Sequence, residues 1–298
     1  MKTDSASRLA GFAGEFETAF EAALHERMGD APPRLGAAVR HAALAGGKRI
    51  RPFLVSECAS LFAADGKDTR SAAFAIECVH CYSLVHDDLP AMDNDALRRG
   101  KPTVHVAFDE ATAILAGDCL LTLAFESLSQ CTEAGRLAAI LARASGAAGM
   151  VGGQLLDLAA EGRFGAANEA MDAEAAIRRI QSMKTGALIV AACEMGAVTA
   201  GASEKQRRAL GEYGRHIGLA FQIADDLLDT EGDAAKLGKA VGKDAHAGKA
   251  TFVGLLGSDG ARRLLGETVN AARSALKALP GNTAILSDLA GYIATRDR

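Results

Sequence analysis

The chain has 298 residues, of which 49% are hydrophobic and 23% are charged, so it can bury a large core without help from disulfides. Its formal net charge at pH 7 is −4, which gives no reason to expect nucleic acid as a partner, because binding to a phosphate backbone usually needs a basic surface. A local basic pocket for a small anionic substrate is still compatible with this charge.

The chain predicts helices along most of its length. No proline occurs between Pro102 and Pro280, that interval is rich in good helix formers, and alternating strand patterns are missing. Expected helices cover residues 5–28, 33–45, 52–64, 69–88, 111–131, 134–159, 173–199, 203–229, 260–278 and 283–296. We expect an all-α fold, with residues 1–298 forming one domain whose helices enclose a deep cavity.

Targeting and membrane signals are weak. The first 20 residues lack the basic start and unbroken apolar core of a signal peptide. The longest apolar stretch, residues 186–202, contains Glu194 and falls short of the roughly 20 apolar residues of a membrane span. We expect a cytoplasmic protein without a membrane span.

The six cysteines do not resemble a disulfide framework in a chain of this length. Cys78 and Cys81 form a C-x-x-C pair, but a zinc site would need a second pair. Buried free thiols are therefore expected.

Two clusters of aspartates each stand at the C-terminal end of an expected long helix. They are Asp87, Asp88 and Asp93 in the first cluster, and Asp225, Asp226 and Asp229 in the second. The helix dipole disfavours anions at that end by roughly 0.3–1 kcal/mol each, and the flanking residues are apolar. A bound cation would offset this repulsion, and Mg²⁺ prefers carboxylate oxygens together with waters and substrate phosphates. Acidic helix ends in water are the simpler alternative.

Basic residues accompany both clusters. Residues 46–52, which we call the basic turn, contain Lys48, Arg49 and Arg51 after two glycines. Arg98, Arg99 and Lys101 follow the first cluster, and Lys184, Lys239 and Lys249 lie further along. None of these runs matches a phosphate-binding Walker loop, but lysine and arginine next to carboxylates indicate a site for a metal-bound polyphosphate.

At this point the sequence resembles a known family. Residues 77–93, with Arg98, Arg99 and Gly100, look like the first aspartate-rich motif of the bacterial farnesyl diphosphate synthases, a branch of the trans-isoprenyl diphosphate synthases. Residues 221–229 look like the second motif. Residues 46–52, 152–154, 184–186, 237–239 and 248–249 are similar to further family signatures, in family order.

The resemblance implies roughly ten core helices around a cavity, a homodimer, and on the order of three Mg²⁺ ions per site, with Mn²⁺ as a substitute. The implied activity joins isopentenyl diphosphate to dimethylallyl and geranyl diphosphate, giving mainly farnesyl diphosphate and pyrophosphate.

The resemblance also implies residue roles. The implied metal ligands are Asp87, Asp88, Asp93, Asp225 and Asp229. The implied contacts to the allylic diphosphate are Arg98, Lys184, Thr185, Gln222, Lys239 and Lys249. The implied contacts to isopentenyl diphosphate are Lys48, Arg51, His80 and Arg99, and Gly47 and Phe221 are further substrate-binding residues. Asp226 joins the catalytic set, and Tyr82 and Ser83 are expected to limit product length.

Asn94 stands where family members often carry another aspartate. Several alternatives remain: a geranyl or geranylgeranyl diphosphate synthase, a terpene cyclase, or a non-catalytic subunit of the same fold. A cyclase would be expected to replace the second aspartate motif, and a non-catalytic subunit to lose aspartates or basic residues.

Overall fold

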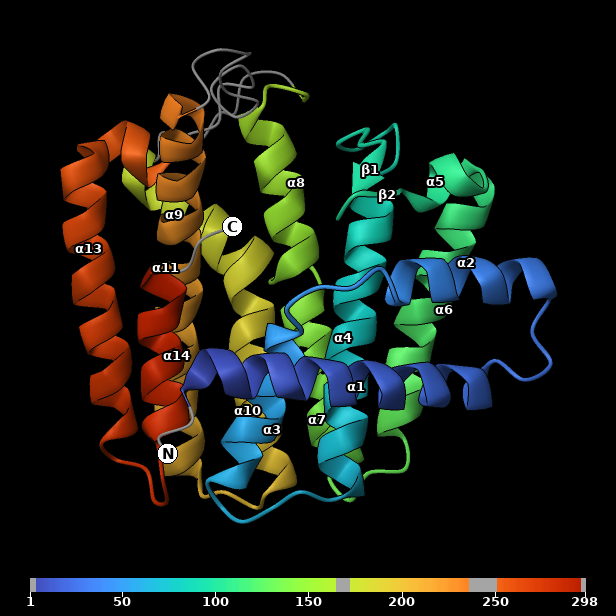
Figure 1. Ribbon diagram of the computed structural model, residues 1–298, viewed down its shortest axis with the longest axis horizontal. Helices are drawn as coiled ribbons and strands as arrows, with labels where there is room; N and C mark the ends of the chain where they lie inside the picture. Colours follow the sequence, from blue (N-terminus) through green and yellow to red (C-terminus); the bar gives the residue numbers. More distant parts are fainter. Residues whose placement is uncertain (1–3, 165–171, 236–250, 296–298) are drawn as a thin grey trace. The chain divides into compact units, whose positions relative to one another are not determined.

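The computed structural model describes residues 4–164, 172–235 and 251–295, and most of them are helical with hardly any strand, which confirms the all-α prediction (Figure 1). By its internal contacts the chain divides into two compact units. The N-terminal unit comprises Met1–Ala139 and Met195–Gly201, and the C-terminal unit comprises Ile140–Glu194 and Ala202–Arg298. The expectation of one domain over residues 1–298 stays a prediction.

The N-terminal unit is built around α4, which carries the first aspartate cluster. Its elements are α1 (Ser5–Arg27), α2 (Pro33–Ala43), α3 (Ile50–Ser60), α4 (Lys67–Asp87), β1 (Leu97–Arg98), β2 (Lys101–Pro102), α5 (Val104–Ala107) and α6 (Glu110–Leu128). α4 packs along α6 and α3, while α1 lies across α3 (Figure 1). Aromatic contacts such as Phe12 with Phe53 and Phe20 with Phe74 join α1 to these helices.

The C-terminal unit carries the second cluster on its longest helix. Its elements are α8 (Met150–Ala160), α9 (Ala173–Gln181), the π-helical turn η1 (Ser182–Gly186), α10 (Ala187–Thr199), α11 (Glu204–Ala235), α13 (Phe252–Leu276) and α14 (Ala284–Thr295). α11 packs against both α13 and α14. Inside this unit, the buried Tyr213 hydroxyl donates a hydrogen bond to the Leu286 carbonyl at 2.7 Å. α7 (Ala134–Ser145) and α10 each have residues in both units.

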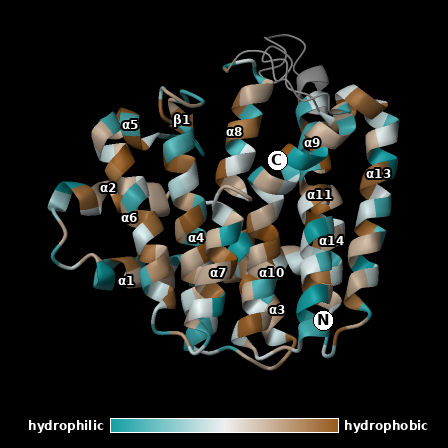
Figure 2. Cartoon of the chain, turned by 180° about the vertical axis from the view of Figure 1, so that it is seen from behind, coloured by the Kyte–Doolittle hydropathy of each residue, from teal (hydrophilic) through white to brown (hydrophobic). Residues whose placement is uncertain are grey.

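Apolar and polar residues alternate around the long helices in Figure 2, as expected for helices with one buried face. α6 is long and apolar enough to cross a membrane by length and composition. It packs on α4 and α2 with half of its apolar window buried, as a core helix does. All six cysteines are free thiols, as expected. The expectation of burial is confirmed for five of them, and Cys119 is partly exposed.

The prediction of a single helix over residues 134–159 is wrong, because the helix is interrupted at residues 146–149, between α7 and α8. Gly149 has φ −133° and ψ −133°, and a Cβ there would collide with the Ala144 carbonyl. Glycine is therefore required at the break. The expected helix over residues 173–199 contains the π-helical turn, and α13 starts earlier than expected, with a kink at Gly257.

Candidate active site

A backbone hydrogen bond closes the loop that carries the first aspartate cluster. Asp87 is the last residue of α4, and Asp88 caps it. The chain then turns back, so that the Asp93 amide donates a hydrogen bond to the Asp87 carbonyl at 2.8 Å. The predicted ligands Asp87 and Asp93, both half-buried, therefore stand together although five residues separate them.

Asp88 is bound by an arginine of the same set. Its Oδ1 accepts a hydrogen bond from Arg98 Nε at 2.7 Å, and its side chain is nearly completely buried. Burial raises the pKa of Asp88, and the contacts with Arg98 oppose that effect. Because Arg98 already binds one carboxylate oxygen of Asp88, the assignment of Asp88 as a metal ligand has less support than that of Asp87 and Asp93.

The basic turn has the open backbone that its glycines predict. Gly46 and Gly47 adopt φ values of +84° and +124°, which side chains disfavour. A Cβ on Gly47 would lie 2.5 Å from the Arg99 guanidinium, and Arg99 Nη1 donates a hydrogen bond to the Gly46 carbonyl. The missing side chain of Gly47 thus lets Arg99 reach the turn that carries Lys48 and Arg51.

Arg51 and His80 lie within this positively charged region. Burial lowers the pKa of Arg51, and Arg99 lowers it further while Glu77 opposes the change. The Arg51 Nε is buried and has no hydrogen-bond partner among the described residues. Burial, followed by Arg51, Arg99, Arg49 and Arg98, holds the pKa of His80 well below its usual value. A neutral imidazole beside an unsatisfied guanidinium is an environment that favours an anion.

The second aspartate cluster opens on a pocket within the C-terminal unit. The pocket encloses about 220 Å³. Its lining includes six of the predicted site residues, namely Lys184, Thr185, Gln222, Asp225, Asp226 and Asp229. They come from η1 and α11, so the structure brings one cation, a hydroxyl, an amide and three carboxylates of two separate sequence motifs into one cavity.

Lys184 is fixed by a residue that the sequence analysis did not select. Its Nζ forms an ion pair with Asp157 of α8 at 2.7 Å, and both residues line the pocket. A Cβ on Gly153 would stand 2.7 Å from the Lys184 Cα, so the glycine allows α8 to approach the π-helical turn closely. Asp157 lies one helical turn after the Gly152-Gly153-Gln154 signature, and that spacing is the signal that could have found it.

Asp226 has a structural partner. Its Oδ2 accepts a hydrogen bond from the Phe252 amide at 2.8 Å, at the start of α13. Hydrogen bonds to a charged group typically contribute about 1.5–3 kcal/mol to stability. Asp226 thus binds the backbone of a neighbouring helix, while Asp225 and Asp229 are its companions in the pocket.

The remaining predicted residues lie as follows. Tyr82 is buried on α4 with an edge-to-face contact to His86, their ring centroids 5.8 Å apart. The Ser83 hydroxyl donates a hydrogen bond to the His80 carbonyl at 2.8 Å within the same helix. Phe221 is half-buried on α11. Lys239 and Lys249 lie outside the described residues.

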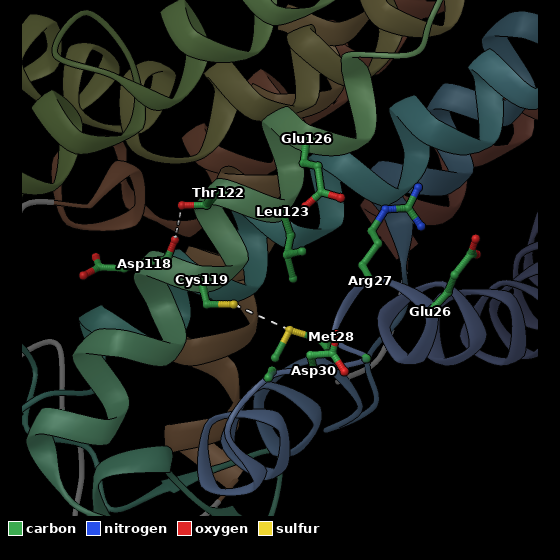
Figure 3. Close-up of a pocket in the computed structure, with 11 residues that line it drawn as sticks. Glu26, Arg27, Met28, Asp30, Asp118, Cys119, Thr122, Leu123 and Glu126 are labelled. Atoms are coloured by element: carbon green, nitrogen blue, oxygen red, sulfur yellow. Dashed lines mark hydrogen bonds between the residues drawn. The ribbon is translucent and has the colours of Figure 1, made fainter.

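A larger cavity of about 610 Å³ lies between the end of α1 and α6 (Figure 3). Its lining includes the carboxylates of Glu26, Asp30, Asp118 and Glu126 but only one cation, Arg27. The pocket at the second aspartate cluster has the same balance of four carboxylates and one cation, so charge does not separate the two cavities, but no predicted site residue lines this one. It is therefore a poor candidate for the substrate site despite its size.

The aspartate pairs of the two clusters fit Mg²⁺ ions that bind together with a substrate diphosphate. Among the described residues, no three carboxylate, histidine or cysteine side chains converge into a complete metal cage. Mg²⁺ rarely needs one, since it usually takes one or two carboxylates and completes its octahedron with waters and substrate phosphates. Asp87 with Asp93, and Asp225 with Asp229, supply such pairs.

Comparison with known proteins gives the family. The polyprenyl synthetase family matches residues 32–278. The chain belongs to that family. It is 48% identical over 273 residues to the farnesyl diphosphate synthase of Escherichia coli (strain K12), covering 87% of this chain and 88% of that protein. It is 41% identical to geranylgeranyl pyrophosphate synthase 9 of Arabidopsis thaliana, over 89% of this chain and 75% of that protein.

A solved structure agrees with this assignment. The chain is similar to the FPP/GFPP synthase of Zymomonas mobilis, with 42% identity, a TM-score of 0.83, and coverage of 97% of this chain and 100% of that one. The polyprenyl synthetase match covers the basic turn and both aspartate clusters, so all of the predicted site residues lie in its range. The sequence-based resemblance to prenyl diphosphate synthases is thereby confirmed.

Proposed function

We propose that this polyprenyl synthetase is a farnesyl diphosphate synthase, which condenses isopentenyl diphosphate with dimethylallyl and geranyl diphosphate. The observation that carries the proposal is the pocket where Lys184, Thr185 and Gln222 stand beside Asp225 and Asp229. Carboxylates that share a pocket with a lysine and neutral polar groups suit a metal-bridged diphosphate better than a metal-free anion. Relatives named for this activity support the choice.

By the family resemblance, the residues that would hold the allylic diphosphate are Arg98, Lys184, Thr185 and Gln222. When its C–O bond breaks, negative charge develops on the diphosphate leaving group. The fixed guanidinium of Arg98 and the ammonium of Lys184 stabilise that charge without reorganisation. Mg²⁺, when bound by Asp87, Asp93, Asp225 and Asp229, adds electrostatic stabilisation of the same leaving group.

Isopentenyl diphosphate would be held by Gly47, Lys48, Arg51, His80 and Arg99. The unsatisfied Nε of Arg51 can donate to a phosphate oxygen, and the neutral His80 can donate without adding charge to an already cationic region. The double bond of this substrate attacks the allylic carbocation, and one proton is then lost. No covalent enzyme intermediate is required, and in this family the departing diphosphate is the implied acceptor of that proton.

Three further properties follow from the family and belong to the proposal. We expect a homodimer, for which the exposed side chains of Val106, Ile114 and Leu115 at α5 and α6 offer an apolar face. We expect each aspartate cluster to bind Mg²⁺ together with a substrate diphosphate. We also expect the protein to work in the cytoplasm.

The test is product formation from isopentenyl and geranyl diphosphate in Mg²⁺. Farnesyl diphosphate and pyrophosphate should form, and removal of Mg²⁺ with a chelator should abolish turnover. D225N should lower kcat by about 100-fold or more, as the loss of one essential electrostatic group does. D259N, an exposed aspartate of the same unit, is the matched control and should leave kcat unchanged.

Unchanged turnover of D225N would contradict the proposed site. A single substitution is a cleaner test than D225A combined with D226A, because Asp226 also holds the start of α13.

Geranylgeranyl diphosphate is the second candidate product, since a curated relative carries that name. Chromatography of the products under saturating isopentenyl diphosphate separates the two activities by chain length.

A further inference from the structure

Arg49 is placed unlike its neighbours in the basic turn. Lys48 is exposed, whereas the Arg49 side chain is fully buried. Its backbone lies in the left-handed region at φ +49°, which residues with a side chain seldom adopt. This conformation turns the Arg49 side chain into the protein between two residues proposed to hold isopentenyl diphosphate.

The buried guanidinium joins several helices of the N-terminal unit. Arg49 Nη1 donates to Glu77 Oε1 of α4 at 2.7 Å, and Nη2 donates to the carbonyl of Ala43, the last residue of α2, at 2.8 Å. Glu17 of α1 is 3.7 Å from Nη2, and the guanidinium lies over the Phe20 ring at 5.7 Å. One side chain therefore ties the turn to α1, α2 and α4.

Glu77 is the matching half of this contact. It is 2% exposed and stands three residues before His80 on α4, almost one helical turn away. A buried carboxylate and a buried guanidinium are tolerated only as a pair, so each fixes the other. The distance between the basic turn and the His80 segment of α4 is thus set by the Arg49–Glu77 bond.

Electrostatics give the pair a second effect. Arg51 and Arg99 both lower the pKa of His80, so positive charges lie close together around His80 in the free enzyme. The Glu77 carboxylate raises the pKa of Arg51 against the effects of burial and Arg99. It supplies negative charge close to these cations from the protein side and so keeps them together in the free enzyme.

We propose that Arg49 and Glu77 form a positioning pair, which preorganises Lys48, Arg51, His80 and Arg99 and thereby sets the affinity for isopentenyl diphosphate. Neither residue touches the substrate in this account. The inference rests on the proposed function, because it presupposes that these four residues hold isopentenyl diphosphate. It predicts a selective effect on one of the two substrates, which a general loss of stability would not produce.

E77Q is the main variant, and E57Q is its control. Glu57 is also buried in this unit and is paired with Arg8 at 3.0 Å, but that pair joins α1 to α3 and does not involve the basic turn. Steady-state kinetics give KM for isopentenyl and for geranyl diphosphate, calorimetry gives isopentenyl diphosphate binding to the free enzyme, and thermal unfolding gives Tm.

E77Q should raise KM and Kd for isopentenyl diphosphate by at least about tenfold, the equivalent of roughly 1.4 kcal/mol, while KM for geranyl diphosphate stays within about twofold. E57Q should lower Tm and leave both KM values within about twofold. If E77Q lowers only Tm, as E57Q does, the positioning role is overturned.

R51Q separates this inference from the proposed function. It should raise KM for isopentenyl diphosphate by more than E77Q does, because it removes a direct contact. An unchanged KM in R51Q would refute the proposed isopentenyl site itself, whatever E77Q shows. If E77Q does not fold, R49K takes its place. R49K keeps the positive charge but loses the two-pronged guanidinium. A raised KM for isopentenyl diphosphate in R49K supports the positioning pair, and an unchanged KM overturns the proposal.

Discussion

Three basic side chains of the candidate site are held by fixed partners in the structure. Arg98 is bound by Asp88, Lys184 by Asp157, and Arg99 by the Gly46 carbonyl. Cations fixed in this way meet a developing negative charge without first having to reorganise, which is how electrostatic catalysis becomes efficient. At the scale of residues, polar contacts therefore orient the positive charges of the site.

Product length should depend on Tyr82. This residue is buried on α4, one turn and a half before Asp87, and it contacts the His86 ring. If it forms the floor of the chain cavity, Y82A should lengthen the product beyond farnesyl diphosphate, whereas Y82F keeps the ring and should not. Chromatography under saturating isopentenyl diphosphate measures both, and an unchanged profile in Y82A would show that the floor lies elsewhere.

Glu194 gives a prediction for stability against pH. Burial raises its pKa above the ordinary value, and Arg215, Arg143 and Arg207 only partly oppose this. A raised folded-state pKa means that the glutamate's favourable contribution is present below its unfolded pKa and is lost as pH rises through the folded pKa. E194Q cannot ionise, so its Tm relative to the wild type should improve from pH 4 to pH 7. A difference that stays constant over this range would contradict the argument.

At the scale of elements, close approach of helices decides where site residues stand. The π-helical turn of residues Ser182–Gly186 carries Lys184 and Thr185, and such turns inside helices frequently mark functional sites. It can pack on α8 only because Gly153 has no side chain. A similar glycine, Gly117 of α6, makes room for His86 at the end of α4.

Replacing Gly153 should therefore damage the site. G153A would force the added methyl against the backbone of Met183 and Lys184, and we expect a loss of about 1–3 kcal/mol in stability together with a raised KM for the allylic substrate. G266A is the control, because a Cβ at that position in α13 meets no atom within 4 Å. It should be neutral or stabilise by up to about 1 kcal/mol. Chemical denaturation and kinetics give both quantities; equal effects of the two changes would be inconsistent with the packing argument.

At the scale of the whole molecule, the apolar face of α5 and α6 predicts self-association. Leu115 is 58% exposed and Ile114 is 45% exposed, side by side on one helix. A charge there should disrupt a homodimer: L115E is expected to sediment as a monomer, whereas L255E, at an exposed leucine of α13, should leave the oligomeric state unchanged. Analytical ultracentrifugation makes the comparison. If L115E keeps the oligomeric state of the wild type, the homodimer does not depend on this face.

Much of the fold could be predicted from local sequence. Proline-free, alanine- and leucine-rich segments specify helices through short-range interactions alone, and most of the expected ranges match the structure within a few residues. The failures depend on contacts that a linear pattern does not show. The break at residues 146–149 and the π-helical turn lie at close backbone contacts of Gly149 and Gly153, and the early start of α13 at Phe252 is bound by the side chain of Asp226.

The sequence by itself determined the helical class, the family and the residue types of the chemistry, because spaced aspartates beside basic residues are readable without coordinates. Only the tertiary structure decided how individual charges are used: Asp88 holds Arg98, Asp226 binds the first amide of α13, Asp157 holds Lys184, and Arg49 turns inward to Glu77. The physical reason is that hydrogen bonds and ion pairs form between residues distant in sequence, so adjacent residues of one type acquire different partners and different roles once the helices pack.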